Sequence, residues 1–314
     1  MLQKRTHILR AIRELFWSWG FVEVDTPLLV AKPGQEPFLD PFETRVEDAS
    51  GHSYPGYLIT SPEYAMKKLL AKSALGEAPE FANIFQLGKV FRNNEDFGGT
   101  HNPEFTMIEW YRLGANYETL MTDVENLLCK LAPQQLVFQN RTINLQTPWP
   151  RMTVEDAFKQ FANRTDAIEL AEKDPSEFFK VFLNEVEPKF RELDHPIFLI
   201  EYPASMAALA KKKESNPRVA ERFECYIVGI ELTNAFSELT DAAEQRARFQ
   251  AEQLERAGLS KTVTPLDEEF LRELPHIKIA AGISLGVDRL LMLLLDAPDI
   301  NEVLFWPCKD QFAD

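Results

Sequence analysis

Residues 91–111, FRNNEDFGGTHNPEFTMIEWY, constrain the fold of this chain more than any other stretch. Arg92 follows an apolar run, and a polar loop containing Gly98 and Gly99 comes next. The chain then returns through Phe105 into a second apolar run. Two such runs joined by a Gly-containing loop predict a β-hairpin. The hairpin either presents a cation, an aromatic face and acids to one pocket, or is an ordinary charged hairpin.

The side chains of this hairpin suit the recognition of a nucleotide and an amine. Arg92 can bind a phosphate through two parallel hydrogen bonds, because its guanidinium is a planar fork. Phe105 can stack on a purine ring. Glu109 and Tyr111 follow in the second strand and can hold a cationic substrate.

Two later segments carry further candidates. GIELTNAFSELTD, residues 229–241, places Glu231 and Glu238 on either side of an asparagine in a strand-like run. AAGISLGVDRLLMLLL, residues 280–295, reads as a strand and a turn that lead into an apolar helix, with Arg289 in its first turn. No GxxxxGK[ST] occurs, which excludes a P-loop mode of phosphate binding.

Composition limits the class of protein. The 314 residues include 34 basic and 49 acidic ones, and the net charge of −15 argues against an extensive RNA surface. The three cysteines are far apart and lack CxxC spacing, as expected in a reducing compartment. The histidines form no zinc pattern. No signal peptide or membrane span is visible, so we expect a soluble, cytoplasmic protein without a membrane partner.

Hydrophobic periodicity and turn residues predict the secondary structure. Strands that mostly follow one another without helices between them favour an antiparallel sheet in an α+β domain. Residues 164–216 are charged and read as a mainly helical insertion, and 73–83 as a loop. The expected helices are 8–19, 62–71, 117–131 and 241–258, and the expected strands are 21–25, 55–61, 84–91, 106–113, 219–228 and 230–236.

Together with FVEVDTP, which ends at Pro27, these segments resemble the class II aminoacyl-tRNA synthetases over nearly the whole chain. FVEVDTP resembles motif 1, the hairpin motif 2, and residues 280–295 motif 3. HNPEFT with GVDR is typical of the lysyl, aspartyl and asparaginyl branch. SPEYAMK at 61–67 is most similar to the short lysyl paralogues that attach β-lysine to elongation factor P.

The resemblance implies a fold and an activity. The fold would be a class II catalytic domain over 1–314, with the insertion at about 164–216, no anticodon-binding domain, and homodimer formation. The activity would be ATP- and Mg²⁺-dependent adenylation of (R)-β-lysine or lysine, then transfer to a lysine of elongation factor P and not to tRNA. Two alternatives remain open: a small lysyl-tRNA synthetase that charges tRNA, and a non-catalytic paralogue that only binds ligand.

The resemblance also implies roles for individual residues. Arg92 and Arg289 would be catalytic, holding the α- and γ-phosphates. Glu224 and Glu231 would bind Mg²⁺. The remaining ATP-binding residues would be Asn93, Asn94, Asn102, Phe105, Glu231, Leu232 and Gly286, and the substrate-binding residues Ser61, Pro62, Glu63, Glu109, Tyr111, Asn234, Glu238 and Ser284. Glu238 with Tyr111 would take the distal ammonium group of the substrate.

The sequence departs from the family pattern in motif 2 and motif 3. The Arg-x-Glu of motif 2 reads Arg92-Asn93-Asn94, with an acid only at Glu95. That change puts one ATP contact in doubt or indicates a local shift. Ser284 stands where lysyl-tRNA synthetases carry Gly. The larger residue narrows the amine end of the pocket, which favours a β-amino acid.

Overall fold

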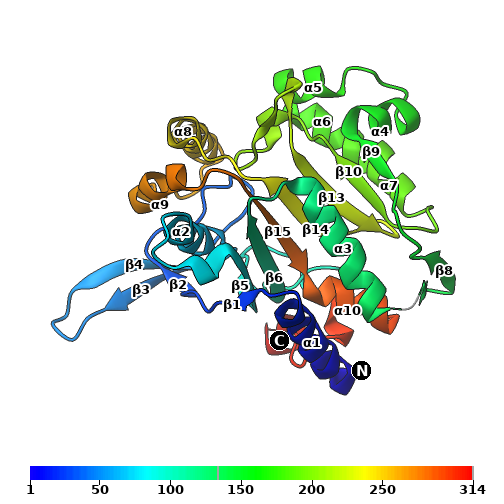
Figure 1. Cartoon of the computed structure of the whole chain (residues 1–314), viewed down its shortest axis with the longest axis horizontal. Coiled ribbons are helices and arrows are strands. Elements are labelled where there is room, and N and C mark those ends of the chain that lie inside the picture. The colour runs from blue at the N-terminus through cyan, green and yellow to red at the C-terminus, as the bar shows by residue number, and fades with distance from the viewer. Residues whose placement is uncertain (133, 313–314) are drawn as a thin grey trace.

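The computed structural model describes residues 1–132 and 134–312, and its centre is a twisted sheet of eight strands with helices around it (Figure 1). In spatial order the strands are β1 (Val22–Glu23), β5 (Asn83–Phe91), β6 (Glu104–Leu113), β15 (Ala280–Gly286), β14 (Ile230–Ser237), β13 (Arg222–Ile227), β10 (Ile197–Ile200) and β9 (Arg151–Thr153). The pairs at the two edges, β1–β5 and β9–β10, are parallel, and all others are antiparallel. The predicted α+β class, largely antiparallel sheet and opening hairpin are confirmed.

The register of the central strands aligns polar side chains across the sheet. Ser284 of β15 pairs with Glu109 of β6 on one side and with Asn234 of β14 on the other. Asn234 in turn pairs with Glu224 of β13. Because successive side chains of a strand point to opposite faces, residues paired in this way share one face. A polar row therefore runs across one face of the sheet.

The opposite face carries the main hydrophobic core. Phe85, Trp110, Ile283 and Ala235 alternate with the polar row and are fully buried or nearly so. Three helices cover them: α1 (Leu2–Ser18), α3 (Tyr117–Leu131) and α10 (Val287–Leu295). The other face is flanked by α2 (Glu63–Ala74), α8 (Ala242–Gly258) and α9 (Glu268–Glu273), whose apolar residues form a smaller core. The polar row thus lies where the helical cover is incomplete.

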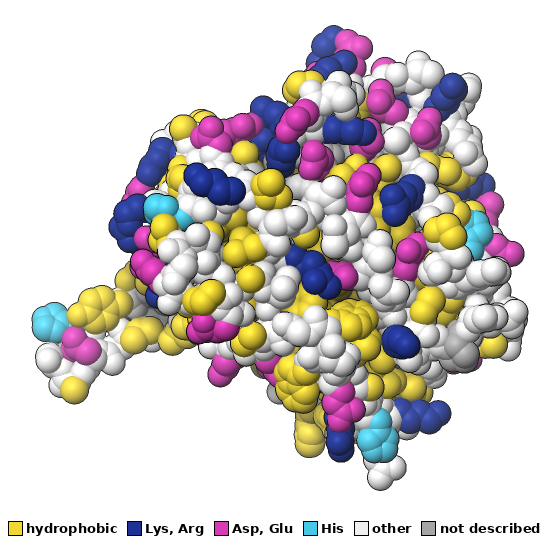
Figure 2. All heavy atoms as spheres, viewed as in Figure 1, with side chains coloured by type: hydrophobic (Ala, Val, Ile, Leu, Met, Phe, Trp, Pro, Cys, Tyr) yellow, Lys and Arg dark blue, Asp and Glu magenta, His cyan; other side chains and the backbone are white. Residues whose placement is uncertain are grey.

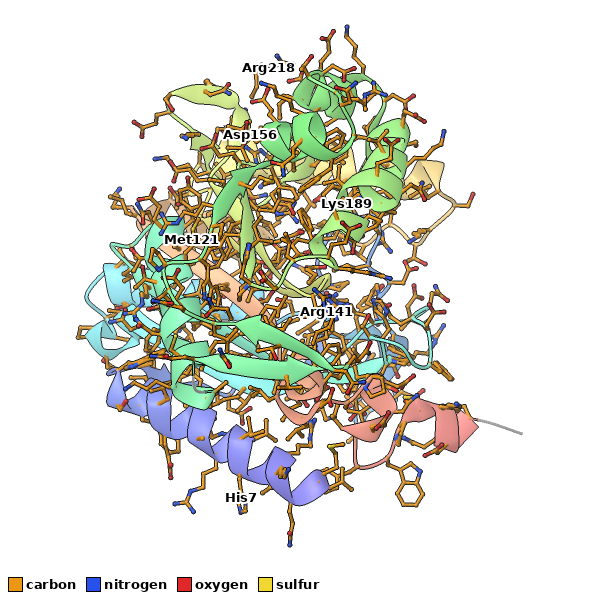
Figure 3. The ribbon with its side chains drawn as sticks, turned by 90° about the vertical axis from the view of Figure 1, so that its right-hand side faces the viewer. His7, Met121, Arg141, Asp156, Lys189 and Arg218 are labelled. Carbon is orange, nitrogen blue, oxygen red and sulfur yellow. The ribbon has the colours of Figure 1, made fainter. Side chains whose placement is uncertain are left out.

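The expected mainly helical insertion is only half right. Helices occupy its first part, and Figure 3 shows them at the top of the molecule, far from α1. Ile197–Ile200, however, is a strand of the central sheet, and 212–220 contains a small two-stranded sheet. IFLI is a short apolar run of the kind found in strands buried on both faces, and its charged surroundings concealed it. The elements involved are α4 (Val154–Phe161), α5 (Ala167–Lys173), α6 (Pro175–Val181), α7 (Glu187–Phe190), β11 (Lys212–Lys213) and β12 (Asn216–Ala220).

Smaller elements surround this body. A hairpin of β3 (Glu43–Glu47) and β4 (Ser53–Leu58) projects from it with hydrophobic side chains along its length (Figure 2). β2 (Leu29–Val30) pairs with its base, β7 (Gln135–Phe138) pairs with β8 (Arg141–Asn144), and α11 (Cys308–Phe312) ends the described chain. Among the described residues, no helix combines the length and apolar character needed to cross a bilayer.

A buried ion pair ties α1 to the strand and helix that border the polar row. Arg5 of α1 is 4% exposed and forms an ion pair with Asp288, in the first turn of α10. Its second terminal nitrogen donates to Thr106 Oγ1 over 2.8 Å. Asp288 Oδ2 accepts from the Thr106 backbone N–H at 2.7 Å. The network fixes the positions of residues 105 and 289, which directly adjoin Thr106 and Asp288.

Candidate functional site

Two cavities open on the polar row and share a wall. The first has a volume of about 370 Å³ and the second about 270 Å³. Glu36, Arg92, Asn234 and Ser284 line both of them. A ligand that spans the shared wall would therefore contact both ends of the row. We refer to the first as the acidic cavity and to the second as the arginine cavity.

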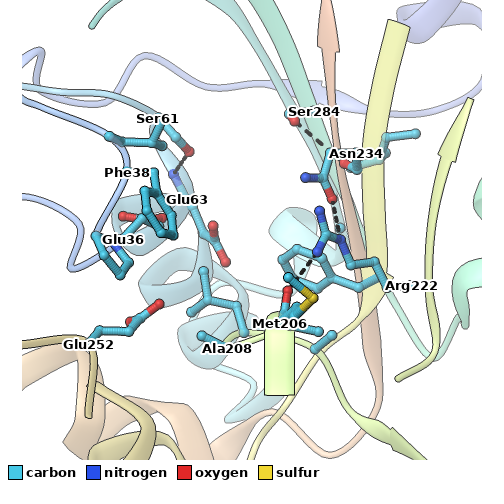
Figure 4. A pocket seen from close by; sticks show the side chains of 18 of the residues that line it. Glu36, Phe38, Ser61, Glu63, Met206, Ala208, Arg222, Asn234, Glu252 and Ser284 are labelled. Atoms are coloured by element: carbon cyan, nitrogen blue, oxygen red, sulfur yellow. Dashed lines mark hydrogen bonds between the residues drawn. The ribbon is translucent and has the colours of Figure 1, made fainter. Parts of the chain in front are cut away.

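The acidic cavity takes its name from the carboxylates in its lining. Figure 4 shows Glu36, Glu63 and Glu252 on one side, with Arg222 and Asn234 across the cavity. Glu63 opens α2 and Glu252 belongs to α8, so helices deliver two of the acids. Such a lining suits a ligand that carries ammonium groups.

Glu109 forms the floor of this cavity and is 3% exposed. The Ser61 hydroxyl donates to its carboxylate, with distances of 2.8 and 3.0 Å to the two oxygens. Burial and the nearby Glu63 hold the pKa of Glu109 well above its usual value, although the Ser61 hydrogen bond opposes the rise. Burial and Glu36 likewise raise the pKa of Glu252 to about 8. A bound cation would lower both pKa values and be held by the resulting carboxylates.

Glu238 lies behind the wall of the acidic cavity and is 3% exposed. It follows β14 and forms an ion pair with Lys67 of α2, which also pairs with Glu63. Gly282 permits this packing, because a Cβ there would collide with Tyr111 and Glu238. The chemistry of the amine end therefore involves a cation of the protein itself.

The arginine cavity contains two guanidinium groups that have N–H donors left over for a ligand. Arg289 donates to the carbonyl oxygens of Thr100 and Glu231, at 3.2 and 2.9 Å. The Arg92 guanidinium lies 5.2 Å from the centre of the Phe105 ring. Within the described residues, its buried Nε has no hydrogen-bond partner. Burial and the neighbouring Arg289 lower the pKa of Arg92, so an anion placed between the two arginines would be stabilised.

His101 borders this cavity beside Arg289. Its Nε2 lies 3.0 Å from Arg289 Nη2, so this ring nitrogen is the acceptor and the imidazole is neutral. Burial and the positive charge of Arg289 lower the pKa of His101, in agreement with that state. His101 therefore helps to orient Arg289.

Glu224 and Glu231, the predicted magnesium ligands, lie on the adjacent strands β13 and β14 as expected. Glu231 faces the arginine cavity, and its carboxylate is 3.7 Å from Arg289 Nη1, too far for a hydrogen bond. Burial and Glu224 raise the pKa of Glu231 to about 7. Glu224 already accepts from Arg222 at 2.6 Å, Tyr226 at 2.6 Å and Tyr202.

This donor set fits Mg²⁺ through Glu231 and one remaining lone pair of Glu224. In the described part of the chain, no group of three or more His, Cys, Asp or Glu side chains is arranged around one point. That is compatible with Mg²⁺, which commonly takes one or two protein carboxylates and completes its coordination with substrate phosphates and water.

The structure brings most of the predicted residues to the cavities, but Asn93 and Asn94 lie outside the lining. The Asn93 backbone N–H donates to Asp40 O at 2.7 Å, and the Asn94 side chain to the Asp40 carboxylate at 2.9 Å. Asn94 has a left-handed backbone (φ 60°). This turn brings the next residue, Glu95, to the arginine cavity. In this chain the acid of the segment that lines the arginine cavity is thus Glu95, three residues after Arg92.

The other predicted residues divide into two groups. Asn102 borders the arginine cavity, but its amide is engaged with Glu104 O and with the backbone N–H of Cys308. Pro62 caps α2 beside the acidic cavity without lining it. The predicted residues that line one or both cavities are Ser61, Glu63, Arg92, Asn102, Phe105, Glu109, Tyr111, Glu231, Leu232, Asn234, Ser284, Gly286 and Arg289.

Sequence reasoning missed several charged residues of the site. Arg222 lines the acidic cavity and donates to Asn234 Oδ1 at 3.2 Å and to Glu224. Its spacing of two residues from Glu224 on a strand signalled a shared face. Lys67 is four residues after Glu63 on one helix, a spacing that favours an ion pair. Glu36 gave no comparable signal, because it lies in a loop.

Comparison with known proteins identifies the relatives of this chain. The family model described as tRNA synthetases class II (D, K and N) matches residues 1–310. An elongation factor P–(R)-β-lysine ligase of Hamiltonella defensa is 39% identical, covering 98% of this chain and 95% of that protein. Those of Proteus mirabilis and Pectobacterium carotovorum are 37% and 40% identical, covering 98% and 96% of this chain and 94% and 93% of theirs.

Proposed function

This chain belongs to the class II tRNA synthetases of the D, K and N type, and on that premise we propose that it is an ATP-dependent ligase of elongation factor P. It activates (R)-β-lysine, or lysine less well, as the adenylate and transfers the acyl group to a lysine side chain of that factor. Its curated relatives are named as elongation factor P–(R)-β-lysine ligases. Residues 1–314 form one catalytic domain in this proposal, with the helices of 164–190 as an insertion.

The observation that carries the proposal is the shared wall of the two cavities. Most of the charged residues that line the acidic cavity are glutamates, the arginine cavity contains Arg92 and Arg289, and Arg92 lines both. A diamino acid in the acidic cavity would direct its carboxylate towards Arg92. A nucleotide in the arginine cavity would direct its α-phosphate towards the same residue. The two reacting groups would then meet at one point, and such positioning accounts for a large share of catalysis in reactions of this kind.

In the first step, a carboxylate oxygen of the amino acid forms a bond to the α-phosphorus, and the bond from this phosphorus to pyrophosphate breaks. Negative charge builds up on the phosphate oxygens. Arg92 stabilises it at the α-phosphate and Arg289 at the γ-phosphate, while Phe105 stacks on the adenine. Glu231 and Glu224 would hold Mg²⁺, which neutralises phosphate charge when bound.

The enzyme selects its substrate by recognising the two amine groups. Glu238 and Tyr111 recognise the distal ammonium group, and Glu63 and Glu109 the one nearer the carboxylate. Asn234, held by Arg222, faces the carboxylate. A site built from buried charged groups rejects analogues that lack the matching amine, because the unpaired carboxylate is costly.

In the second step, a neutral lysine amine of the acceptor attacks the acyl carbon, AMP leaves, and the nitrogen loses a proton. We infer a protein acceptor instead of tRNA, because the net charge of −15 disfavours an extended phosphate backbone. We also infer a homodimer, since α1 and β1 correspond to the motif 1 unit through which the resembled family pairs.

Amino-acid-dependent ATP–pyrophosphate exchange tests the proposal. We expect exchange with (R)-β-lysine, weaker exchange with lysine, and none without an amino acid. Exchange with neither diamino acid would overturn the proposed activity and favour a ligand-binding paralogue.

A further inference from the structure

Lys67 is a buried cation at the amine end of the cleft. Its side chain is 1% exposed, and its ammonium group forms ion pairs with Glu63 and Glu238. It does not line either cavity. The two carboxylates that it bridges are those that the proposed function assigns to the two amines of the substrate. A resident ammonium group therefore stands between the two recognition groups.

The position of this ammonium group is fixed from several sides. It lies 5.3 Å from the centre of the Phe236 ring and 5.9 Å from that of Phe270, within the range of cation–π attraction. Burial lowers the pKa of Lys67, but Glu238 and Glu63 outweigh burial and raise it above its ordinary value. Lys67 is thus charged at physiological pH and is held by its surroundings in contact with both acids.

Glu238 depends on Lys67 for its own charge. Burial raises the pKa of Glu238 above its usual value, and the ammonium group of Lys67 opposes that rise. The titratable groups facing Glu238 in the described structure are Lys67 and Glu63 from α2 and Tyr111 from β6. Of these, only Lys67 favours the ionised carboxylate.

Lys67 thus contacts Glu63 and Glu238 from behind the acidic cavity, whose lining also includes Glu36, Glu109, Glu252, Arg92 and Arg222. We propose that Lys67 is a positioning residue that keeps Glu238 ionised and sets the pocket for a diamino acid. This inference rests on the proposed function, because it takes the two carboxylates as the amine-binding groups.

Lys67→Met tests the inference, since it removes the charge and keeps the length of the side chain. Without Lys67 the pKa of Glu238 rises further, so that at neutral pH the carboxyl group is protonated and cannot pair with the substrate. We expect the KM for β-lysine in the exchange assay to rise about tenfold near pH 7 and to recover as the pH is raised, the behaviour expected when a group must lose its proton to act. The KM for ATP should be unchanged.

Two further variants make the result specific. Lys67→Arg keeps the charge and should retain the pH profile of the natural enzyme. Lys68→Met is the matched control, because Lys68 is the next residue on α2 and pairs with Asp267 and Glu269 outside the cavities. If Lys67→Met does not fold, Lys67→Gln carries the same expectations.

The outcomes separate this inference from the proposed function. Natural enzyme that exchanges with β-lysine, together with a Lys67→Met variant whose KM and pH profile are unchanged or whose KM falls, would overturn the role of Lys67 alone. Equal changes in the KM for ATP and for β-lysine would also overturn it, since they would indicate a general structural effect. Absence of exchange by the natural enzyme would instead overturn the proposed function.

Discussion

The acidic and the arginine cavities differ in how their charged side chains are paired within the protein. At the acidic cavity, Glu63 of the lining and Glu238 behind it share the ammonium group of Lys67, and Glu109 accepts a hydrogen bond from Ser61. In the arginine cavity, Arg92 and Arg289 repel one another. In the acidic half a protein ammonium group is paired with two carboxylates, whereas in the arginine half Arg92 Nε has no hydrogen-bond partner among the described residues and Arg289 lies 3.7 Å from the Glu231 carboxylate.

This difference explains how neighbouring cavities can bind an amine in one and stabilise a reacting phosphate in the other. Buried carboxylates without a counter-ion would take up protons at neutral pH, and the resident lysine limits this. Guanidinium groups remain charged at any physiological pH, so the arginines need no such partner. The carboxylates of Glu63 and Glu238 are thus paired with a protein cation, whereas the two guanidinium groups stay charged without such support.

The largest expected effect concerns Glu238. Glu238→Gln removes the carboxylate at the amine end, and breaking a buried charge pair costs about 3–5 kcal/mol. We expect kcat/KM for β-lysine to fall by about 10³-fold, with ATP binding nearly unchanged. Exchange kinetics measure kcat/KM, and nucleotide titration measures ATP binding. Glu268→Gln is the control, because Glu268 pairs with Arg246 on the exposed surface. Near-normal kcat/KM would show that the acidic half does not recognise the amine.

Arg289→Ala tests the arginine half in the same assay. Loss of one preorganised stabiliser of developing charge typically slows a reaction by about 10²–10³-fold. We therefore expect pyrophosphate exchange to slow by that factor while the protein stays folded. Arg272, which is exposed and pairs with Glu273, provides the Arg272→Ala control. A rate within about threefold of the natural enzyme, far short of that loss, would mean that Arg289 has a structural role.

Ser61→Ala tests whether a hydrogen bond from the protein keeps the Glu109 carboxylate ionised. The Ser61 hydrogen bond lowers the pKa of Glu109 against the effect of burial, so its removal raises that pKa. Hydrogen bonds to charged groups contribute about 1.5–3 kcal/mol, and we expect about a tenfold loss in kcat/KM for β-lysine at neutral pH. The loss should shrink as pH rises. The exposed Ser18→Ala on α1 is the control. A loss independent of pH would contradict this reading of Glu109.

The smallest expected effect concerns Ser284, which lines both cavities. Ser284→Gly opens space beside the amine and should favour lysine over β-lysine. A group of this size shifts discrimination by about 1–3 kcal/mol, and we expect the lower end, roughly fivefold in the ratio of kcat/KM values. An unchanged ratio would exclude a steric role for the Ser284 hydroxymethyl group.

Local patterns in the sequence predicted much of the fold, and the resemblance to the class II synthetases indicated most of the residues that line the cavities. Periodicity and turn residues predicted the β5–β6 hairpin, and the Asp241 side chain accepts hydrogen bonds from the backbone N–H groups of Ala243 and Glu244 where the helix expected over 241–258 begins. Contacts made by distant residues could not be predicted. Arg5 pairs with Asp288, 283 positions away, and no spacing rule connects the two.

The same limit applies to the residues that the sequence analysis missed. The burial of Lys67 could not be predicted from its place on a helix, because it depends on β14 and α9 packing over it. The position of Asn94 was predicted from the Arg-x-Glu motif, whereas its left-handed turn is set by pairing with Asp40. Side-chain identity indicated the chemistry, and tertiary packing decided which groups reach the ligand.

Transfer of labelled β-lysine tests the central claim most directly. The enzyme, ATP, Mg²⁺ and radiolabelled (R)-β-lysine are incubated with elongation factor P in one reaction and with total tRNA in another. The account predicts label on a lysine of the protein factor and none on tRNA. Label on tRNA with none on the factor would contradict it and identify a small tRNA-charging synthetase instead.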